Sequence, residues 1–286
     1  MILNNWSFRK VTIIGVGLMG GSLGLALKKH QLAREIVGLS QKQSTLVNAM
    51  KMKAIDIGFT DVRKAVNNAD LVILSTPVEA IKKLLPAIAP HLKRGCIVTD
   101  MGSAKADIVE EAEKVLPQSV FFVGSHPMVG SEKKGVDFAQ ENLFENSLCL
   151  MTPTPKTHAQ AKDRVTALWT KLGVRVKYLP PEEHDKILAY VSHLPHLVAF
   201  ALMGTIPQEF LEFGASGLRD TTRVASSSPQ MWHDICFLNS KNIVNSLDEF
   251  VKSLSELRKA IVDDDQNGLL TYFTKSKEKR DGLLQQ

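Results

Sequence analysis

A glycine-rich segment near the N-terminus restricts the fold of this chain more than any other feature. Gly15-Val16-Gly17-Leu18-Met19-Gly20 has the spacing GxGxxG, follows an apolar run at residues 11–15 and begins a helical pattern at residues 18–30. A strand, a tight turn and a helix in this order are typical of a dinucleotide-binding turn. Gly15 permits the turn, Gly17 lets a pyrophosphate approach the backbone, and Gly20 lets the helix pack closely on the strand.

Strand-like and helix-like segments alternate along the first 180 residues. The predicted strands are 11–15, 36–39, 71–74, 97–99, 120–123, 148–151 and 174–178. The predicted helices are 18–30, 44–53, 79–89, 105–116 and 159–172. Continuous apolar strands between helices indicate a parallel sheet covered on both faces. We therefore predict an α/β, Rossmann-like, doubly wound parallel sheet domain over residues 1–180.

The pattern changes after Leu179-Pro180-Pro181. From that point no clear strand follows, and residues 185–202, 230–239 and 241–262 have helical periodicity. Residues 181–286 are therefore predicted to form a second, all-α domain, whose length is normal for a domain.

Composition excludes several classes of protein. The net charge of +5 is spread along the chain, which argues against nucleic-acid binding but suits small anionic molecules. Cys96, Cys149 and Cys236 form no CxxC pair, so we expect neither a disulfide framework nor a metal site, and a reducing cytoplasm fits.

An uncharged run at residues 11–27 imitates a targeting signal, because basic residues precede and follow it. The run is short for a membrane span, and five glycines interrupt it. We interpret it as a buried strand, turn and helix, and we expect no membrane partner.

The end of the second predicted strand bears on the choice of cofactor. NAD-binding folds usually place an acidic residue there, whereas this chain has Leu39-Ser40-Gln41-Lys42-Gln43. Ser40 and Lys42 suit a 2′-phosphate, although a plain polar loop explains them equally well. We predict NADP in preference to NAD. The predicted cofactor contacts are Gly15, Gly17, Leu18, Met19, Gly20, Ser40, Gln41, Lys42 and the Ser75-Thr76-Pro77 turn after the strand at 71–74.

Polar motifs follow two of the later strands, and two more lie in the helical region. These are Thr99-Asp100-Met101-Gly102-Ser103-Ala104-Lys105, Gly124-Ser125-His126-Pro127-Met128-Val129-Gly130, Ser192-His193-Leu194-Pro195-His196 and Ser216-Gly217-Leu218-Arg219-Asp220-Thr221-Thr222-Arg223. Taken singly, each motif has an ordinary structural explanation, such as a loop histidine or a surface arginine. A metal reading of the histidine pair is poor, because the sequence suggests no third ligand.

Taken together, these motifs resemble the prephenate/arogenate dehydrogenases of tyrosine biosynthesis. The order GxGxxG, DxxSxK, GSHPM, SHLPH, SGLRDTTR and then Pro229-Gln230-Met231-Trp232 extends over nearly the whole chain. The resemblance implies a Rossmann-like domain followed by a helical dimerisation domain, and a homodimer built through residues after Pro181. The acid that NAD-type members carry after the second strand is missing here.

The resemblance also implies roles for individual residues. His126 matches the catalytic histidine and Ser103 the serine that orients the substrate hydroxyl. Arg223 matches the arginine that binds a substrate carboxylate. The other implied pocket residues are His193 or His196, Glu132, and Trp232, which reaches the partner subunit's site.

The implied reaction suits these side chains. Prephenate carries a ring hydroxyl opposite a carboxylate, so a neutral histidine can take the hydroxyl proton during hydride transfer, while arginine binds a carboxylate bidentately. Arogenate as the substrate stays open. Two rivals are a 3-hydroxyacid dehydrogenase, for which Lys186 is the nearest catalytic lysine, and a nucleotide-binding redox sensor without catalysis.

Overall fold

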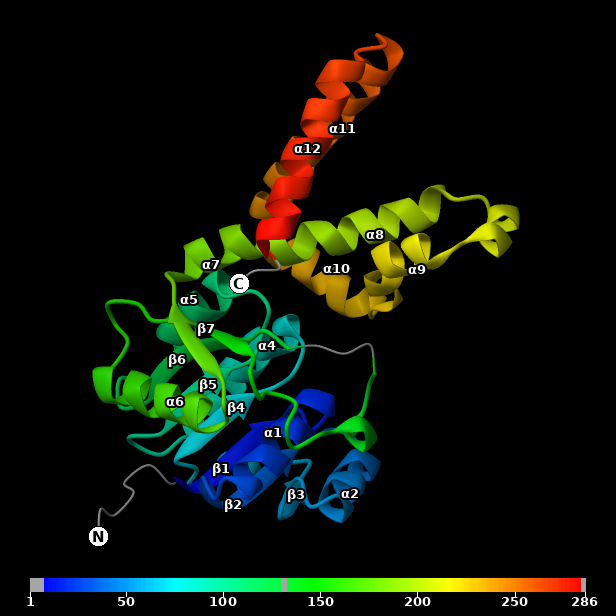
Figure 1. The fold of residues 1–286 in the computed structure, drawn as a ribbon. Coiled ribbons are helices and arrows are strands. Elements are labelled where there is room, and N and C mark those ends of the chain that lie inside the picture. The colour runs from blue at the N-terminus through cyan, green and yellow to red at the C-terminus, as the bar shows by residue number, and fades with distance from the viewer. Residues whose placement is uncertain (1–7, 130–132, 284–286) are drawn as a thin grey trace. The chain divides into compact units, whose positions relative to one another are not determined.

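The computed structural model describes residues 8–129 and 133–283. Contacts divide the chain into two compact units, Met1–Ser240 and Lys241–Gln286. The first unit holds a sheet covered by helices, followed by a helical segment (Figure 1).

The sheet of the first unit starts from the strand and helix on either side of the glycine turn. The strand order is β3-β2-β1-β4-β5-β6-β7-β8. The strands are β1 (Phe8–Ile14), β2 (Ala33–Leu39), β3 (Ile57–Phe59), β4 (Leu71–Leu74), β5 (Ile97–Asp100), β6 (Phe121–Pro127), β7 (Leu148–Thr152) and β8 (Arg175–Tyr178). Strands β1 to β6 are all parallel, so the carboxyl ends of β1, β4, β5 and β6 lie at one edge of the sheet.

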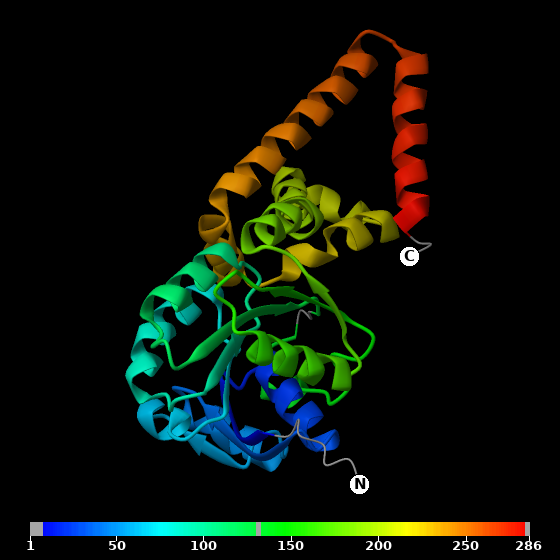
Figure 2. The same cartoon turned by 90° about the vertical axis from the view of Figure 1, so that its left-hand side faces the viewer.

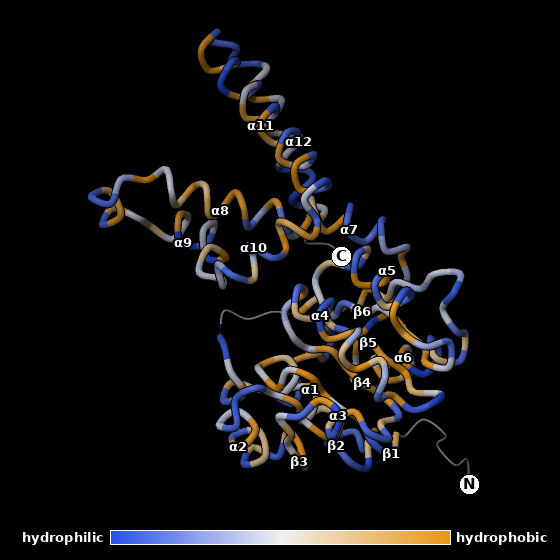
Figure 3. The backbone as a smooth tube through the Cα atoms, turned by 180° about the vertical axis from the view of Figure 1, so that it is seen from behind, coloured by the Kyte–Doolittle hydropathy of each residue, from blue (hydrophilic) through white to orange (hydrophobic). Residues whose placement is uncertain are grey.

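Successive side chains of the strands point to opposite faces of the sheet, and helices cover both. Val11 and Ile13 belong to a cluster that includes α1 (Leu18–Lys29), α2 (Gln43–Lys51) and α6 (Ala159–Lys171). On the other face, Thr12 Oγ1 donates to the carbonyl of Ala65 in α3 (Val62–Val66) at 2.8 Å. This face is also covered by α4 (Val78–Ile88) and α5 (Ala106–Val115). Burial on both faces explains why β4 is hydrophobic along its whole length (Figure 3).

A helical segment follows β8. It consists of α7 (Pro181–Leu188), the π-helix η3 (Ala189–His193), α8 (Leu194–Thr205), the 3-10 helix η4 (Gln208–Phe213), α9 (Ser216–Thr222), the 3-10 helix η5 (Arg223–Ser226) and α10 (Pro229–Leu238). Pro195, which has no N–H for the helical ladder, is the second residue after the π-helix. Such π-helical turns frequently occur at functional sites.

The run Pro181–Thr205 is long and apolar enough, by length and composition alone, to cross a membrane, and it is the one such run in the described part of the chain. A single run of this kind is weak evidence for a membrane span. Only 22% of its most apolar stretch is buried, so much of its apolar surface is available for contact with another chain.

The second unit consists of two long helices. α11 (Ser240–Val262) and α12 (Gln266–Leu283) diverge from the turn that joins them (Figure 2), and the hydroxyls of Ser253 and Tyr272 form a hydrogen bond between them. Both helices expose apolar side chains, namely Val244, Val251, Leu254, Ile261, Val262, Leu270, Phe273 and Leu283.

The predicted fold class is confirmed, with one correction to the sheet. Strand β7 runs antiparallel to β6, and β8 is parallel to β7. The prediction of a wholly parallel sheet was wrong here because the chain between β6 and β7, in its described part, contains only the short 3-10 helix Val136–Phe138 instead of a crossover helix. The short elements β3, α3 and α9 were not predicted. The domain boundary between residues 180 and 181 stays a prediction.

Candidate active site

The glycine turn between β1 and α1 has the geometry that a nucleotide needs. Gly15 has φ +94°, and a Cβ there would lie 2.6 Å from the carbonyl oxygen of Ser75. A Cβ at Gly20 would lie 2.2 Å from the carbonyl oxygen of Gly15, so this glycine lets α1 pack on the turn. A Cβ at Gly17, by contrast, would meet no described atom within 4 Å. The open space in front of Gly17, at the N-terminus of α1, suits a pyrophosphate.

Polar groups beside the turn also fit a ligand. Ser75 Oγ and Thr76 Oγ1, just after β4, are buried and have no hydrogen-bond partner within the described residues. Buried hydroxyls normally find a partner, so a bound molecule would satisfy them. At the end of β2, Ser40 Oγ accepts from the Lys42 backbone N–H at 3.3 Å, while the side chains of Gln41 and Lys42 are exposed. Nucleotide contacts at these positions stay a prediction.

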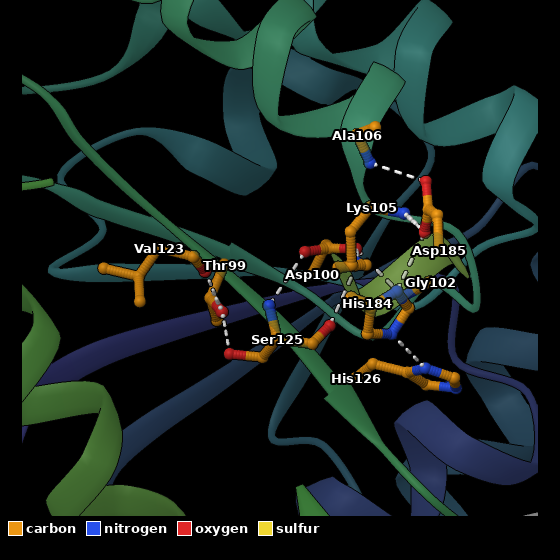
Figure 4. A network of polar contacts seen from close by, with 10 residues as sticks. All are labelled: Thr99, Asp100, Gly102, Lys105, Ala106, Val123, Ser125, His126, His184 and Asp185. Carbon is orange, nitrogen blue, oxygen red and sulfur yellow. Dashed lines mark hydrogen bonds and ion pairs between the residues drawn. The ribbon is translucent and has the colours of Figure 1, made fainter. Parts of the chain in front are cut away.

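A buried ion pair holds the turn that carries Ser103. Lys105 and Asp100 are fully buried, and the ammonium of Lys105 contacts the carboxylate of Asp100 (Figure 4). Lys105 Nζ also donates to the Ser125 carbonyl at 3.0 Å. Asp100 accepts from the backbone N–H groups of Gly102 at 2.9 Å and Ser125 at 3.2 Å. The pair therefore joins the ends of β5 and β6 to the start of α5.

His126, near the end of β6, is the first member of a chain of three polar side chains. Its Nδ1 lies 2.9 Å from His184 Nε2, and His184 Nδ1 lies 2.8 Å from Asp185 Oδ1 (Figure 4). His184 and Asp185 belong to α7. Asp185 also accepts from the backbone N–H groups of Lys105 at 2.8 Å and Ala106 at 2.9 Å, at the N-terminus of α5.

Burial sets the protonation of these two histidines. It lowers the pKa of His126 well below the ordinary value, and positive charge at His184 and Lys105 would lower it further. Burial also lowers the pKa of His184, although the hydrogen bond to Asp185 opposes this effect. Both rings are therefore neutral at pH 7.

His193 lies at the end of the π-helix and is fully buried. Its Nδ1 lies 3.1 Å from the side-chain nitrogen of Asn239, which also donates to the Asp185 carbonyl at 2.7 Å. The other ring nitrogen, Nε2, is buried without a hydrogen-bond partner among the described residues. Burial lowers the pKa of His193 to about 4, while the nearby Asp185 and the Ser103 backbone act in the opposite direction. Ser103 itself is half-buried.

His196 and Trp232 pack on each other beside His193. Their rings stack at 3.9 Å, and Trp232 also meets the edge of His193 at 5.9 Å. His196 Nδ1 donates to the Ser192 carbonyl at 2.8 Å. Burial lowers the pKa of His196, and the charge of Arg223 contributes in the same direction, so Arg223 lies within electrostatic range. Arg223 is the first residue of η5.

Two further predicted residues, Glu132 and Lys186, are not part of the buried histidine cluster that the structure describes. Glu132 lies outside the described residues. Lys186, the nearest candidate for the catalytic lysine of a 3-hydroxyacid dehydrogenase, is exposed on α7, whereas His126, His184 and His193 are buried. Within the described part of the chain, no group of three or more His, Cys, Asp or Glu side chains is placed to hold a metal.

Comparisons with known proteins show the family of this chain. Residues 23–178 match the family description "Prephenate dehydrogenase, nucleotide-binding domain", and residues 180–275 match "Prephenate dehydrogenase, dimerization domain". The prephenate dehydrogenase of Bacillus subtilis (strain 168) is 38% identical over 280 residues, which are 96% of this chain and 76% of that protein. This chain belongs to the prephenate dehydrogenase family.

Two further relatives of this family match over nearly their whole length. The cyclohexadienyl dehydrogenase of Zymomonas mobilis is 34% identical and is covered to 95%, with 96% of this chain covered. A crystal structure of prephenate dehydrogenase from A. aeolicus, in complex with hydroxyphenyl propionate and NAD+, has a TM-score of 0.92 at 34% identity, covering 98% of this chain and 100% of that one. Membership confirms the predicted family, the fold class and the enzyme class, a nicotinamide-dependent dehydrogenase.

Sequence reasoning missed three residues that contact the site histidines, namely His184, Asp185 and Asn239. His184 lies 58 positions from His126, so only the fold brings the two rings together. One signal was present. Pro181 and the acidic residues after it mark a helix start, and a histidine and an aspartate directly follow.

Proposed function

We propose that this chain converts prephenate to 4-hydroxyphenylpyruvate by oxidative decarboxylation, with hydride transfer to a nicotinamide cofactor. The observation that carries the proposal is His126, a buried neutral histidine at the sheet edge where the glycine turn also ends. Family membership over nearly the whole chain supports the same reaction.

His126 acts as the base in this proposal. When bound, the cofactor supplies the acceptor for the hydride that leaves C4 of the substrate ring. Positive charge then develops on the carbon that carries the hydroxyl, and withdrawal of the hydroxyl proton by His126 stabilises it. Ser103, in the turn after β5, orients the hydroxyl. Carbon dioxide departs and the ring becomes aromatic, which makes the reaction irreversible.

The helical segment supplies the groups that bind the substrate. Arg223 binds a carboxylate through its planar pair of N–H groups. His193 Nδ1 accepts from Asn239, so its proton is on Nε2, and this buried N–H is a donor for the substrate. His196 and Trp232 form a stacked wall beside it. Trp232, which was predicted to reach the partner subunit's site, is instead buried against His193 and His196 of its own chain and lines this pocket. A role of Glu132 in binding the substrate stays a prediction.

Arogenate is the alternative substrate, because it differs from prephenate only in carrying an amino acid side chain in place of the keto acid. The similarity to a cyclohexadienyl dehydrogenase makes this alternative worth a direct test. We propose NADP as the better cofactor, because an exposed Lys42 can reach a 2′-phosphate and no acid follows β2. We also propose a cytoplasmic homodimer in which the apolar surfaces of α8, α11 and α12 are covered by the second chain.

Steady-state kinetics with each substrate and each cofactor test these assignments. Prephenate should give reduced cofactor and 4-hydroxyphenylpyruvate, and NADP should be used at least as well as NAD. A hundredfold preference for NAD would refute the cofactor choice, whereas Ser40→Asp should move preference toward NAD. Tight cofactor binding without turnover of either substrate would favour the redox sensor.

Two variants separate the proposed roles. His126→Asn should lower kcat by roughly 100- to 10,000-fold with little change in KM, because a general base acts in the transition state. Arg223→Ala should mainly raise KM, by an apparent ~2–4 kcal/mol, because the carboxylate is bound in both states. His158→Asn, at an exposed histidine that stacks on Phe121 at the start of β6, is the matched control and should keep full activity. Full activity of His126→Asn would refute the proposed chemistry.

A further inference from the structure

We propose that His184 and Asp185 are positioning residues that hold His126 in the tautomer whose free lone pair is on Nε2. The inference rests on the proposed function, since it assigns the origin of the basic nitrogen of His126. Neither residue touches the reacting atoms in this proposal. Their role is to fix which nitrogen of His126 accepts the substrate proton.

The argument starts at Asp185, because a carboxylate can only accept hydrogen bonds. Its Oδ1 accepts from the Lys105 backbone N–H at 2.8 Å, and its Oδ2 accepts from the Ala106 backbone N–H at 2.9 Å. The two N–H groups belong to the first turn of α5, whose partial positive charge favours the anion. His184 Nδ1, at 2.8 Å from Oδ1, must therefore carry a proton and donate it.

This assignment determines the next hydrogen bond. A neutral His184 with its proton on Nδ1 has a lone pair on Nε2. His126 Nδ1 lies 2.9 Å from that nitrogen, so it must be the donor (Figure 4). The proton of neutral His126 is then on Nδ1, and its lone pair is on Nε2. The acceptor-only carboxylate of Asp185 thus sets the direction of both hydrogen bonds, from His184 to Asp185 and from His126 to His184, and no choice of tautomer remains.

The same segment gives His193 the opposite tautomer. The side-chain nitrogen of Asn239 donates to both the Asp185 carbonyl and His193 Nδ1, which leaves the His193 proton on Nε2. The site therefore contains one imidazole that accepts at Nε2 and one that donates at Nε2. A substrate with a hydroxyl to deprotonate and acceptor groups to bind needs both.

Two substitutions at one position test the inference. In His184→Gln, the side-chain carbonyl can accept from His126 and the side-chain NH2 can donate to Asp185, so the direction of both hydrogen bonds is preserved. In His184→Leu, His126 loses its acceptor and the tautomer is no longer fixed. We expect His184→Leu to lower kcat by roughly 100- to 10,000-fold, as when the orienting acid of a Ser-His-Asp triad is replaced, with KM within threefold. His184→Gln should retain at least a tenth of the original kcat.

The dependence of kcat on pH adds a readout that a merely structural role would not move. His184 Nε2 accepts from His126 Nδ1 and so stabilises the imidazolium that forms on His126 in the reaction. Removal of this acceptor in His184→Leu should lower the pKa of His126 and shift the acidic limb of the kcat profile to lower pH. His184→Gln should keep the original limb. If near-ultraviolet circular dichroism shows that His184→Leu does not fold, Asp185→Asn replaces it. An amide nitrogen turned toward His184 would donate to it, and this would reverse the direction of the hydrogen bonds between Asp185, His184 and His126.

The outcomes distinguish this inference from the proposed function. A His184→Leu kcat within threefold of the original, together with an inactive His126→Asn variant, would overturn the positioning role and leave the general base in place. Equal losses in His184→Gln and His184→Leu would also overturn it, because they would point to proton transfer through the His184 ring. Full activity in His126→Asn would instead refute the proposed function itself.

Discussion

The buried pair of Lys105 and Asp100 offers a stability prediction that the structure defines closely. Lys105→Met removes the ammonium and leaves the Asp100 carboxylate fully buried. Two backbone N–H groups, from Gly102 and Ser125, would still donate to it. They do not replace the lost cation, and breaking a buried pair from one side typically costs about 3–5 kcal/mol.

Unfolding of the purified variant measures this loss. The free energy of unfolding in urea should fall by about 3–5 kcal/mol, and the melting temperature by roughly 6–20 °C for a unit of this size. The double variant Asp100→Asn, Lys105→Met should recover at least half of the loss, because it no longer buries an unpaired charge.

The neighbouring pair of Lys82 and Asp107 provides a matched control. Its two charged groups lie 2.9 Å apart on α4 and α5, but both side chains are partly exposed. Lys82→Met should therefore cost less than ~1 kcal/mol. A loss below ~1 kcal/mol in Lys105→Met, or a double variant no more stable than the single one, would refute the reasoning about burial.

Three further perturbations test other parts of the molecule. The pKa of His193 is about 4 in the folded chain and 6.5 in an unfolded one, so the unfolded state binds the proton first as the pH falls. The stability should fall by about 3 kcal/mol between pH 6.5 and pH 4, and unfolding experiments should show a shallower fall for His193→Asn. Gly20→Ala should destabilise the fold by ~1–3 kcal/mol, because the new Cβ meets the Gly15 carbonyl. Gly17→Ala should keep the stability of the fold and weaken cofactor binding in a fluorescence titration. The reverse pattern would contradict the roles assigned to the two glycines. Light scattering at micromolar concentration should give twice the chain mass of 31.6 kDa, and a monomer mass would exclude the homodimer.

Much of the fold could be predicted because its signals are local. The strand, glycine turn and helix at residues 8–29 follow from spacing and from apolar periodicity alone. The direction of β7 could not be predicted, because an apolar strand has the same composition whichever way it runs. Strand β3, with three residues, and α3, with five, are too short for periodicity to mark them.

The site divides in the same way. His126 and Arg223 are predicted site residues because their motifs are contiguous in the sequence. His184 and Asp185 lie next to the exposed Glu182 and Glu183, so their stretch has the composition of an ordinary solvated helix start. Their burial depends on where α7 meets α5 and β6, which is a property of the folded chain and not of the segment.

The cap that Asp185 places on α5 makes the two halves of the polypeptide dependent on each other. The carboxylate that completes the first turn of a helix in the sheet region comes from beyond residue 180. A fragment that stopped there would keep its glycine turn but would lack the cap, the partner of His126 and the segment that orients it. Even with an intact sheet, such a fragment would lack the residues that we propose to orient His126. Recombination between relatives should therefore succeed only when α5, β6 and α7 are inherited together.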